Sequence, residues 1–231
     1  MGRYNLLDES WIPVLRKDTG VVENVSLLTL FMHAPAYKAL AGEMETQNFA
    51  VLRVLLAVLV TVFTRVDQDG EPYEWLELNE ASGNKLVVEE PVDEVDAEDY
   101  LDALDETWQA IWKEHRFPTI VNEYLEAWRD RFYLLDDTYP FFQVTKKDLA
   151  ARLSPEKGTS ALHAKSFAGK QMNRLISESN NKEAIFAPVV GKKKNHMTAA
   201  ELARWLITMQ GYVGTSDKGK FPIDGKITSS K

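Results

Sequence analysis

The stretch over residues 44–65 is the feature that most constrains the fold of this 231-residue chain. Its large apolar side chains recur every three or four residues, the spacing of one face of a helix, at Phe49, Leu52, Leu55, Leu56, Leu59 and Phe63. The uncharged run at residues 54–63 has ten residues, whereas spanning a bilayer takes about 20. We therefore expect a buried helix at the centre of the core.

The residues before this helix predict a β-hairpin and a short helix. Residues 4–15 and 21–25 are two apolar runs around a polar turn that ends in Gly20, a pattern typical of a hairpin. Ser26 is placed to cap a short helix, which must end before Pro35 because proline cannot continue it.

The residues after it predict two more helices packed by aromatic side chains. One amphipathic stretch begins near Asp96 and another covers residues 120–134. Between the central helix and these two, residues 82–97 are polar and acidic, which predicts a surface loop. The expected fold class is α+β: a predominantly helical large domain with an N-terminal β-hairpin and long basic loops.

A last helix is predicted from residue 198 to residue 210. Thr198 and Glu201 have the spacing of a capping box, and Gly211 is the expected stop. Its apolar face would be made by Leu202, Trp205, Leu206 and Met209. Well before it, residues 136–140 break the chain in a turn ahead of an extended segment at residues 141–144.

Charge divides the chain into an acidic helical part, about 1–140, and a basic part, about 141–231. Residues 1–140 carry 11 Lys and Arg against 28 Asp and Glu, whereas residues 141–231 carry 16 against 7. The net charge of −8 is therefore the sum of −17 for residues 1–140 and +9 for residues 141–231. A basic region of this kind is typical of a surface that faces nucleic-acid phosphates.

The densest basic run is Lys192, Lys193 and Lys194, which we assign to DNA binding. A run of lysines alone is equally typical of a solvated loop. The other basic residues of the same part favour the phosphate-facing interpretation: Lys146, Lys147, Arg152, Lys157, Lys165, Lys170, Arg174, Lys182, Lys218, Lys220, Lys226 and Lys231.

The residues for enzymatic chemistry are missing or badly spaced. The chain has no cysteine, which excludes a disulfide, a thiolate zinc site and a cysteine nucleophile. The four histidines, His33, His115, His163 and His196, lack the spacing of metal ligands, and the paired carboxylates have polar neighbours. The glycines near residues 211–219 do not form a phosphate-binding loop. We expect no catalytic residue, metal or cofactor; a carboxylate hydrolase is the weakest alternative.

Four segments resemble one family, CasA, the large subunit of type I-E CRISPR Cascade. Residues 5–14, with the sequence NLLDESWIPV, resemble its opening, and residues 132–143 resemble its later aromatic segment. Residues 181–186 resemble a loop that ends in an aromatic residue, and residues 198–210 resemble a helix followed by a glycine loop. The resemblance covers essentially all 231 residues.

This resemblance implies a non-catalytic subunit of an RNA-guided antiviral complex. It would recognise the protospacer-adjacent motif in double-stranded DNA, promote target unwinding and recruit a helicase-nuclease. Its partners would be guide RNA, other Cascade subunits and target DNA, with no membrane. Because the family is more than twice as long, we expect the chain to be its N-terminal portion, without the C-terminal helical bundle. The absence of a signal peptide predicts a cytoplasmic location.

The resemblance also assigns contact residues. DNA binding is assigned to the segment after the last helix, at Gly211, Gly214, Lys218, Gly219 and Lys220. Contact with guide RNA and other subunits is assigned to Asn180, Asn181, Lys182 and Phe186. The alternative is a helical protein-interaction domain with no direct nucleic-acid role. Salt dependence separates the two, because only phosphate binding falls steeply with salt.

Overall fold

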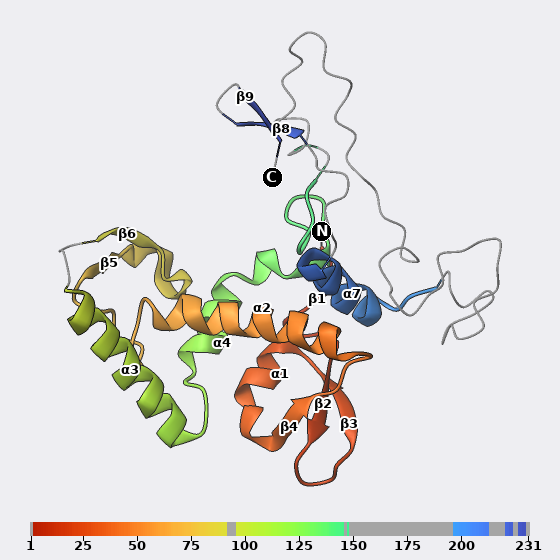
Figure 1. Ribbon diagram of the computed structural model, residues 1–231, viewed down its shortest axis with the longest axis horizontal. Coiled ribbons are helices and arrows are strands. Elements are labelled where there is room, and N and C mark those ends of the chain that lie inside the picture. Colours follow the sequence, from red (N-terminus) through yellow and green to blue (C-terminus); the bar gives the residue numbers. More distant parts are fainter. Residues whose placement is uncertain are drawn as a thin grey trace. The chain divides into compact units, whose positions relative to one another are not determined.

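The computed structural model describes residues 2–91, 96–145, 147, 196–212, 220–223 and 226–229. The chain forms two compact units. We call Asn5–Phe132 the helical unit, and Met1–Tyr4 together with Tyr133–Lys231 the C-terminal unit. The described residues are a mixture of helices and strands, as the α+β class predicts (Figure 1).

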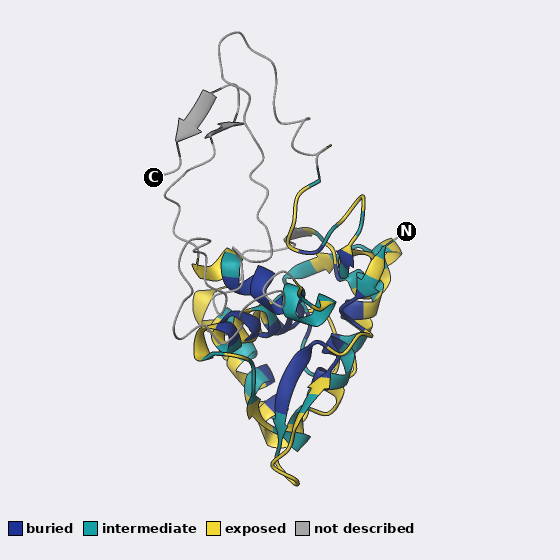
Figure 2. Cartoon of the chain, turned by 90° about the vertical axis from the view of Figure 1, so that its right-hand side faces the viewer, coloured by how far each residue is buried: buried dark blue, intermediate teal, exposed yellow. Residues whose placement is uncertain are grey.

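The helical unit begins with a small antiparallel sheet. Its strands are ordered β3-β2-β4: β2 (Ile12–Arg16), β3 (Val22–Val25) and β4 (Tyr37–Leu40). The predicted hairpin is therefore confirmed, with a third strand added to it. Gly20 has a positive φ of 67° in the turn, which forms the exposed lowest tip in Figure 2.

The predicted short helix is also confirmed. It is α1 (Leu27–Met32), and the hydroxyl of Ser26 accepts a hydrogen bond from the Thr29 amide at 3.2 Å. A 3₁₀ turn, η1 (Ala34–Ala36), follows it and leads into β4. The cap satisfies one of the free amides at the start of this short helix.

The central helix, α2 (Glu45–Phe63), is present, but its buried face differs from the predicted one. It buries Ala50, Val51, Leu55, Val58, Leu59, Val62 and Phe63. The assignment of Phe49, Leu52 and Leu56 to the core is wrong, since these side chains are 50–54% exposed. Apolar residues occupy almost every side of α2, so periodicity alone could not select the packed face. By length and composition α2 could also cross a membrane, but core helices of soluble proteins meet the same criterion.

A hairpin replaces part of the predicted surface loop at residues 82–97. Strand β5 (Leu76–Leu78) pairs antiparallel with β6 (Val88–Pro91), and a 3₁₀ segment, η2 (Glu80–Lys85), connects them. The acidic side chains of this stretch had suggested a loop, but a two-stranded hairpin accommodates polar residues on both strands. That part of the loop prediction is wrong.

Two helices complete the unit. The first, α3 (Ala97–Glu114), begins at Asp96, whose carboxylate accepts from the Glu98 amide at 2.9 Å. The second, α4 (Ile120–Ala127), is shorter than the predicted 120–134, because a 3₁₀ turn, η3 (Arg129–Arg131), follows it. Figure 1 shows α3 near the C-terminal end of α2, and the sheet of β2, β3 and β4 near the N-terminal end of α2.

Aromatic side chains attach α3 to the end of α2. The rings of Phe63 and Trp108 meet edge to face, with centroids 5.4 Å apart. The Tyr73 hydroxyl donates to the carbonyl of Phe63 at 3.2 Å and lies 2.8 Å from the Thr107 hydroxyl. Tyr73 also stacks on Trp75 at 4.6 Å. These polar and ring contacts fix the helix although α3 buries little of its own surface.

Residues 5–11 form a junction, which we call the N-terminal junction, and bury the side chains of Asn5, Leu6, Leu7 and Trp11. Leu6 and Leu7 are fully buried, and the Trp11 indole N–H donates to the Leu6 carbonyl at 2.9 Å. The Leu6 amide donates to the Phe132 carbonyl at 2.9 Å, and the Leu27 amide donates to the Leu6 carbonyl at 3.2 Å. The junction therefore joins the start of α1 to the end of the unit.

The described C-terminal unit contains a two-stranded sheet, one helix and a hairpin. Strand β1 (Arg3–Asn5) pairs with β7 (Tyr133–Leu135). The helix α7 (Ala199–Tyr212) is followed by the antiparallel hairpin of β8 (Lys220–Ile223) and β9 (Lys226–Ser229).

Three predictions in this unit need correction. Gly211 lies inside α7 and does not end it, because a helix tolerates glycine at a cost of about 1 kcal/mol. Lys220 begins a strand and does not belong to a loop. Residues 141–144 are not extended, since Phe141 and Phe142 form a turn in which Phe142 has a φ of 55°.

We predict that Asn5→Ala destabilises the helical unit. The buried Asn5 side chain accepts from the Leu7 amide at 2.9 Å and donates to the Arg129 carbonyl at 3.2 Å. Removing it leaves both groups without this partner, which should cost about 1–3 kcal/mol in urea unfolding. The exposed Asn24→Ala is the control, expected within about 0.5 kcal/mol of wild type. Equal stability of the two variants would contradict the role of Asn5.

Candidate nucleic-acid interface

The start of α7 is fixed by the predicted capping box. The Thr198 amide donates to a Glu201 carboxylate oxygen at 2.7 Å, and the Glu201 amide donates to the Thr198 hydroxyl at 3.2 Å. The Thr198 hydroxyl also donates to the Glu201 carboxylate at 2.9 Å. Local sequence therefore sets where this helix begins.

The end of α7 is fixed by a contact with the turn after β7. The Gln210 side-chain amide donates to the Phe142 carbonyl at 3.2 Å. The side-chain amide of Gln143, the next residue, donates to the Leu134 carbonyl at 2.8 Å. These bonds connect the last turn of α7 to β7 through residues 141–143, so the point from which residues 213–219 leave the helix is anchored.

Asp136 shapes the turn that makes this contact. One carboxylate oxygen accepts from the amides of Thr138 and Tyr139, both at 2.8 Å. The two backbone N–H groups hold the pKa of the Asp136 carboxyl below its usual value, the Tyr139 amide having the larger effect. The turn predicted at residues 136–140 is confirmed, and the Asp136 carboxylate stabilises it.

The structure places two of the assigned DNA-binding residues. Gly211 lies exposed in the last turn of α7, and Lys220 begins β8, opposite Ser229 in the register. Helix α7 and strand β8 therefore lie on either side of residues 213–219 in the chain. The other assigned residues lie outside the described part: Gly214, Lys218, Gly219, Lys192, Lys193, Lys194, Asn180, Asn181, Lys182 and Phe186.

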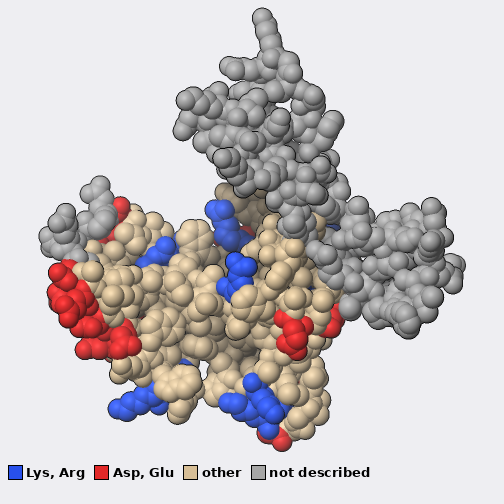
Figure 3. Space-filling model, in the orientation of Figure 1, with Lys and Arg blue, Asp and Glu red and all other residues tan. Residues whose placement is uncertain are grey.

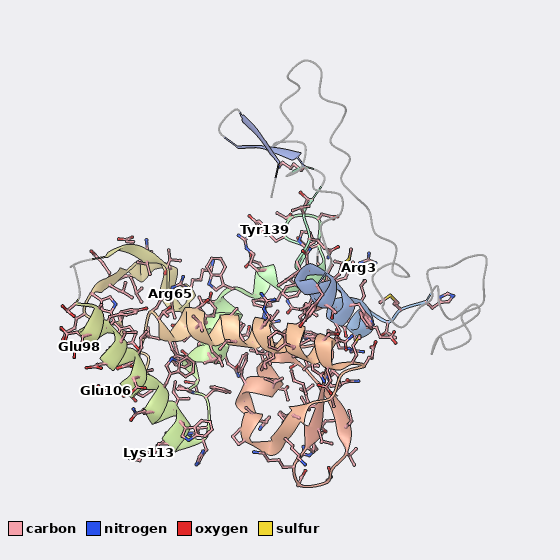
Figure 4. The ribbon with its side chains drawn as sticks, viewed as in Figure 1. Arg3, Arg65, Glu98, Glu106, Lys113 and Tyr139 are labelled. Carbon is pink, nitrogen blue, oxygen red and sulfur yellow. The ribbon has the colours of Figure 1, made fainter. Side chains whose placement is uncertain are left out.

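Helix α3 concentrates negative charge in the helical unit. Figure 3 shows Asp and Glu side chains gathered at the left edge, where Figure 1 places α3. The exposed acidic residues of α3 are Glu98, Asp99, Asp102, Asp105, Glu106 and Glu114. In Figure 4, Glu98 and Glu106 point away from α2. This face would repel nucleic-acid phosphates.

Ion pairs neutralise some of the other carboxylates of this unit. Arg129 binds Glu126 through two contacts of 2.6 Å and reaches Asp8 at 3.0 Å. Hydrogen bonding to Arg129 lowers the pKa of Asp8. Among the described residues, no group of three or more His, Asp or Glu side chains is placed to hold a metal ion.

The family follows from a match over nearly the whole chain. The sequence profile described as CRISPR-associated protein Cse1 matches residues 5–226. The chain belongs to the Cse1 family. This is the CasA family of the type I-E Cascade, so the resemblance noted in the sequence is confirmed. A search among curated protein sequences returned no match.

Solved structures share the fold of this Cse1 chain. Cse1 of Thermobifida fusca is 24% identical, with a TM-score of 0.55, over 95% of this chain and 32% of that one. Cse1 of Acidimicrobium ferrooxidans is 23% identical, with a TM-score of 0.55, over 99% and 33%. A chain of a pre-nicking CRISPR RNA-guided surveillance complex is 12% identical, with a TM-score of 0.60, over 99% and 38%. The chain thus spans about a third of the length of these Cse1 structures.

The opening motif of this Cse1 chain has a structural task. Asn5, Leu6, Leu7 and Trp11 form the N-terminal junction, and Asp8 binds Arg129. The residues of this motif therefore stabilise the fold, through buried side chains and one ion pair.

We predict that Thr198→Ala destabilises α7 by about 1 kcal/mol, because the helix loses its side-chain cap. Thr198→Ser keeps the hydroxyl and should remain close to wild type. Helix content and thermal unfolding, followed by circular dichroism, measure the effect. If alanine and serine at this position behave alike, the cap does not stabilise the helix.

We predict that the effect of Asp136→Ala on stability depends on pH. The folded state lowers the pKa of this carboxyl, so the ionised group stabilises the turn above the unfolded pKa, which is about 3.9. That stabilisation is lost as the pH falls through the folded pKa. The stability difference between wild type and Asp136→Ala should therefore be largest near pH 7 and shrink toward pH 3 in urea unfolding. A difference that stays constant with pH would contradict this role.

Proposed function

We propose that this Cse1-family chain acts in a type I-E Cascade as part of the subunit that recognises the protospacer-adjacent motif in double-stranded DNA. The observation that carries the proposal is the family match over residues 5–226. It is supported by a fold shared with chains of CRISPR RNA-guided surveillance complexes, at TM-scores of 0.60 and 0.57. The complex works in the cytoplasm without a cofactor in this chain.

The DNA contact lies in residues 211–220. Glycine lets a backbone approach a groove without an intervening side chain, and Lys218 and Lys220 offset phosphate charge. The anchored end of α7 supports this assignment, because the segment that follows starts from a fixed point. Gly214 makes the closest approach to the motif.

The remaining assignments complete the role. Lys192, Lys193 and Lys194 bind phosphates without regard to sequence. Asn180, Asn181, Lys182 and Phe186 contact guide RNA and neighbouring subunits. Motif binding favours opening of the duplex for guide pairing, and the assembled complex then recruits a helicase-nuclease. The chain itself performs no catalysis.

A second candidate, a protein-interaction domain without a nucleic-acid role, is favoured by one observation. Helix α2 exposes an apolar stripe at i, i+3, i+7 and i+11: Phe49, Leu52, Leu56 and Val60. Stripes of this kind are typical of surfaces that another protein covers. Binding through such a stripe would change little with salt, whereas binding through the proposed phosphate contacts would weaken steeply as salt rises.

We predict separate effects for the two basic segments. The triple substitution Lys192→Ala, Lys193→Ala and Lys194→Ala should weaken binding of intact-motif and scrambled-motif duplexes alike. It should also flatten the salt slope by roughly 0.9 per lost phosphate contact. Gly214→Asp should remove only the preference for the intact motif. The measurement is duplex binding at several salt concentrations to the complex assembled with guide RNA.

Matched variants control for charge and for position. Lys17→Ala, Lys38→Ala and Lys113→Ala remove three exposed lysines of the helical unit and should leave DNA binding unchanged. Thr215→Ala changes the neighbour of Gly214 without adding charge. If neither the lysine cluster nor Gly214 affects binding, the DNA-recognition proposal is wrong and the interaction domain replaces it.

A further inference from the structure

Helix α3 exposes an apolar stripe along one edge of its packed face. The stripe consists of Leu101, Trp108 and Trp112, which are seven and four residues apart and therefore share one side of the helix. Trp108 packs on Phe63 in the core, whereas Leu101 is 61% exposed and Trp112 is 78% exposed. We call these three residues the α3 stripe, which begins in the core and continues into solvent.

The exposure of Trp112 indicates a contact surface. Its ring meets the ring of His115 edge to face, with centroids 6.3 Å apart, and most of its surface stays in water. Single exposed apolar residues are common, but this tryptophan is connected through Trp108 to a second exposed apolar side chain, Leu101. Tryptophan is also among the residues that contribute most to binding when they enter a pocket of another protein.

Acidic side chains lie beside the α3 stripe on its solvent side. Asp105 is four residues after Leu101 and seven before Trp112, so it shares their side of the helix. Glu98 is seven residues before Asp105, and in Figure 4 it points away from α2. Both are exposed, and within the described part of the chain neither forms an ion pair; Asp105 accepts a hydrogen bond from the Gln109 side chain. Their charges are therefore open to a cation from outside.

The charge of α3 decides which class of partner fits this face. The helix carries six acidic residues and one basic residue, Lys113. Nucleic acids and anionic membrane surfaces would be repelled. A second copy of this chain, related by a two-fold axis through the same face, would bring Asp105 and Glu98 against their own copies, and like charges oppose such a contact. A basic protein surface is the partner that matches both the carboxylates and the apolar side chains.

We propose that the α3 stripe and the carboxylates beside it form a docking face for a basic surface of another protein subunit of the complex. Trp112 and Leu101 enter an apolar recess of that subunit, and arginine or lysine side chains around the recess pair with Asp105 and Glu98. An arginine can also stack on the face of the Trp112 indole. The apolar anchors supply most of the affinity, while the carboxylates select a basic partner and speed its association.

This inference rests on the proposed function, because it takes the chain as a subunit of a Cascade. The basic residues of the chain itself are assigned there to nucleic-acid phosphates, which leaves the face on α3 for a different protein. The docking face uses none of the residues assigned to DNA or RNA. It therefore adds a protein contact that can be removed without changing the nucleic-acid contacts.

The test is association of the subunit with the guide-RNA complex assembled without it, in the absence of target DNA. Trp112→Ala and Asp105→Arg should each weaken association at least tenfold. Asp105→Asn removes the charge without reversing it and should weaken association several-fold. Since both side chains are exposed, the variants should fold as wild type does.

Glu106→Arg is the matched control on the same helix. Glu106 is exposed, but it is two residues before Trp108 and six before Trp112, so it lies away from the α3 stripe. Its charge reversal should leave association within threefold of wild type. Circular dichroism and urea midpoints equal to those of wild type exclude misfolding as the cause of any loss. If Glu106→Arg weakens association as much as Asp105→Arg, only the net charge of the helix matters and the docking face is wrong.

Photo-crosslinking identifies the occupant. Gln109 is exposed, four residues after Asp105 and three before Trp112, so Gln109→p-benzoylphenylalanine places the probe beside both contacts and keeps them. In the assembled complex, the expected cross-link joins a basic segment of another protein subunit. Changing the arginine or lysine of that segment to glutamate should restore association of Asp105→Arg. A cross-link to nucleic acid, to this chain, to a second copy of it, or to no partner overturns the proposal.

The docking face and the proposed function fail in different ways. If wild type associates with the complex and both Trp112→Ala and Asp105→Arg associate equally well, only the docking face is wrong. If wild type does not associate at all, the proposed function fails and the docking face fails with it.

Discussion

The helical unit depends on the N-terminal junction, because this junction joins segments that are distant in sequence. Asn5 bonds the Leu7 amide and the Arg129 carbonyl, and Leu6 bonds both Leu27 and Phe132 through its backbone. Full burial of Leu6 and Leu7 adds about 1.5–3 kcal/mol for each side chain. The bond from Leu27 also places the start of α1, which contacts α4.

Helix α3 is held in the helical unit mainly by aromatic and hydroxyl contacts. It buries only Thr107 and Ile111 completely, so apolar burial along its own face contributes little. The hydroxyl of Tyr73 and the ring of Phe63 hold its middle, and Trp75 meets Tyr100 of its first turn edge to face, while its acidic side chains stay in solvent. The same arrangement explains how a strongly acidic helix can belong to a compact unit without burying charge.

Local signals in the sequence predicted the hairpin, the Ser26 cap, the extent of α2 and the capping box of α7, because each depends on neighbouring residues. Contacts between distant residues were not predictable. Phe49 and Leu55 are both apolar, and only packing distinguishes the exposed one from the buried one. The hydrogen bond from the Asn122 side chain to the Leu28 carbonyl was also not predictable, since the two residues are 94 positions apart. The assigned DNA-binding and RNA-binding residues were drawn from charge and resemblance, and of these the structure placed Gly211 and Lys220.

The two ends of α7 are secured independently, one by a capping box within the helix and the other by Gln210 on the Phe142 carbonyl. Neither of these bonds involves residues 180–195, before the helix, or residues 213–219, after it. The two bonds therefore do not require any particular side chain at residues 180–195 or 213–219. A relative can change the sequence on either side of α7 and still keep both hydrogen bonds at the ends of the helix.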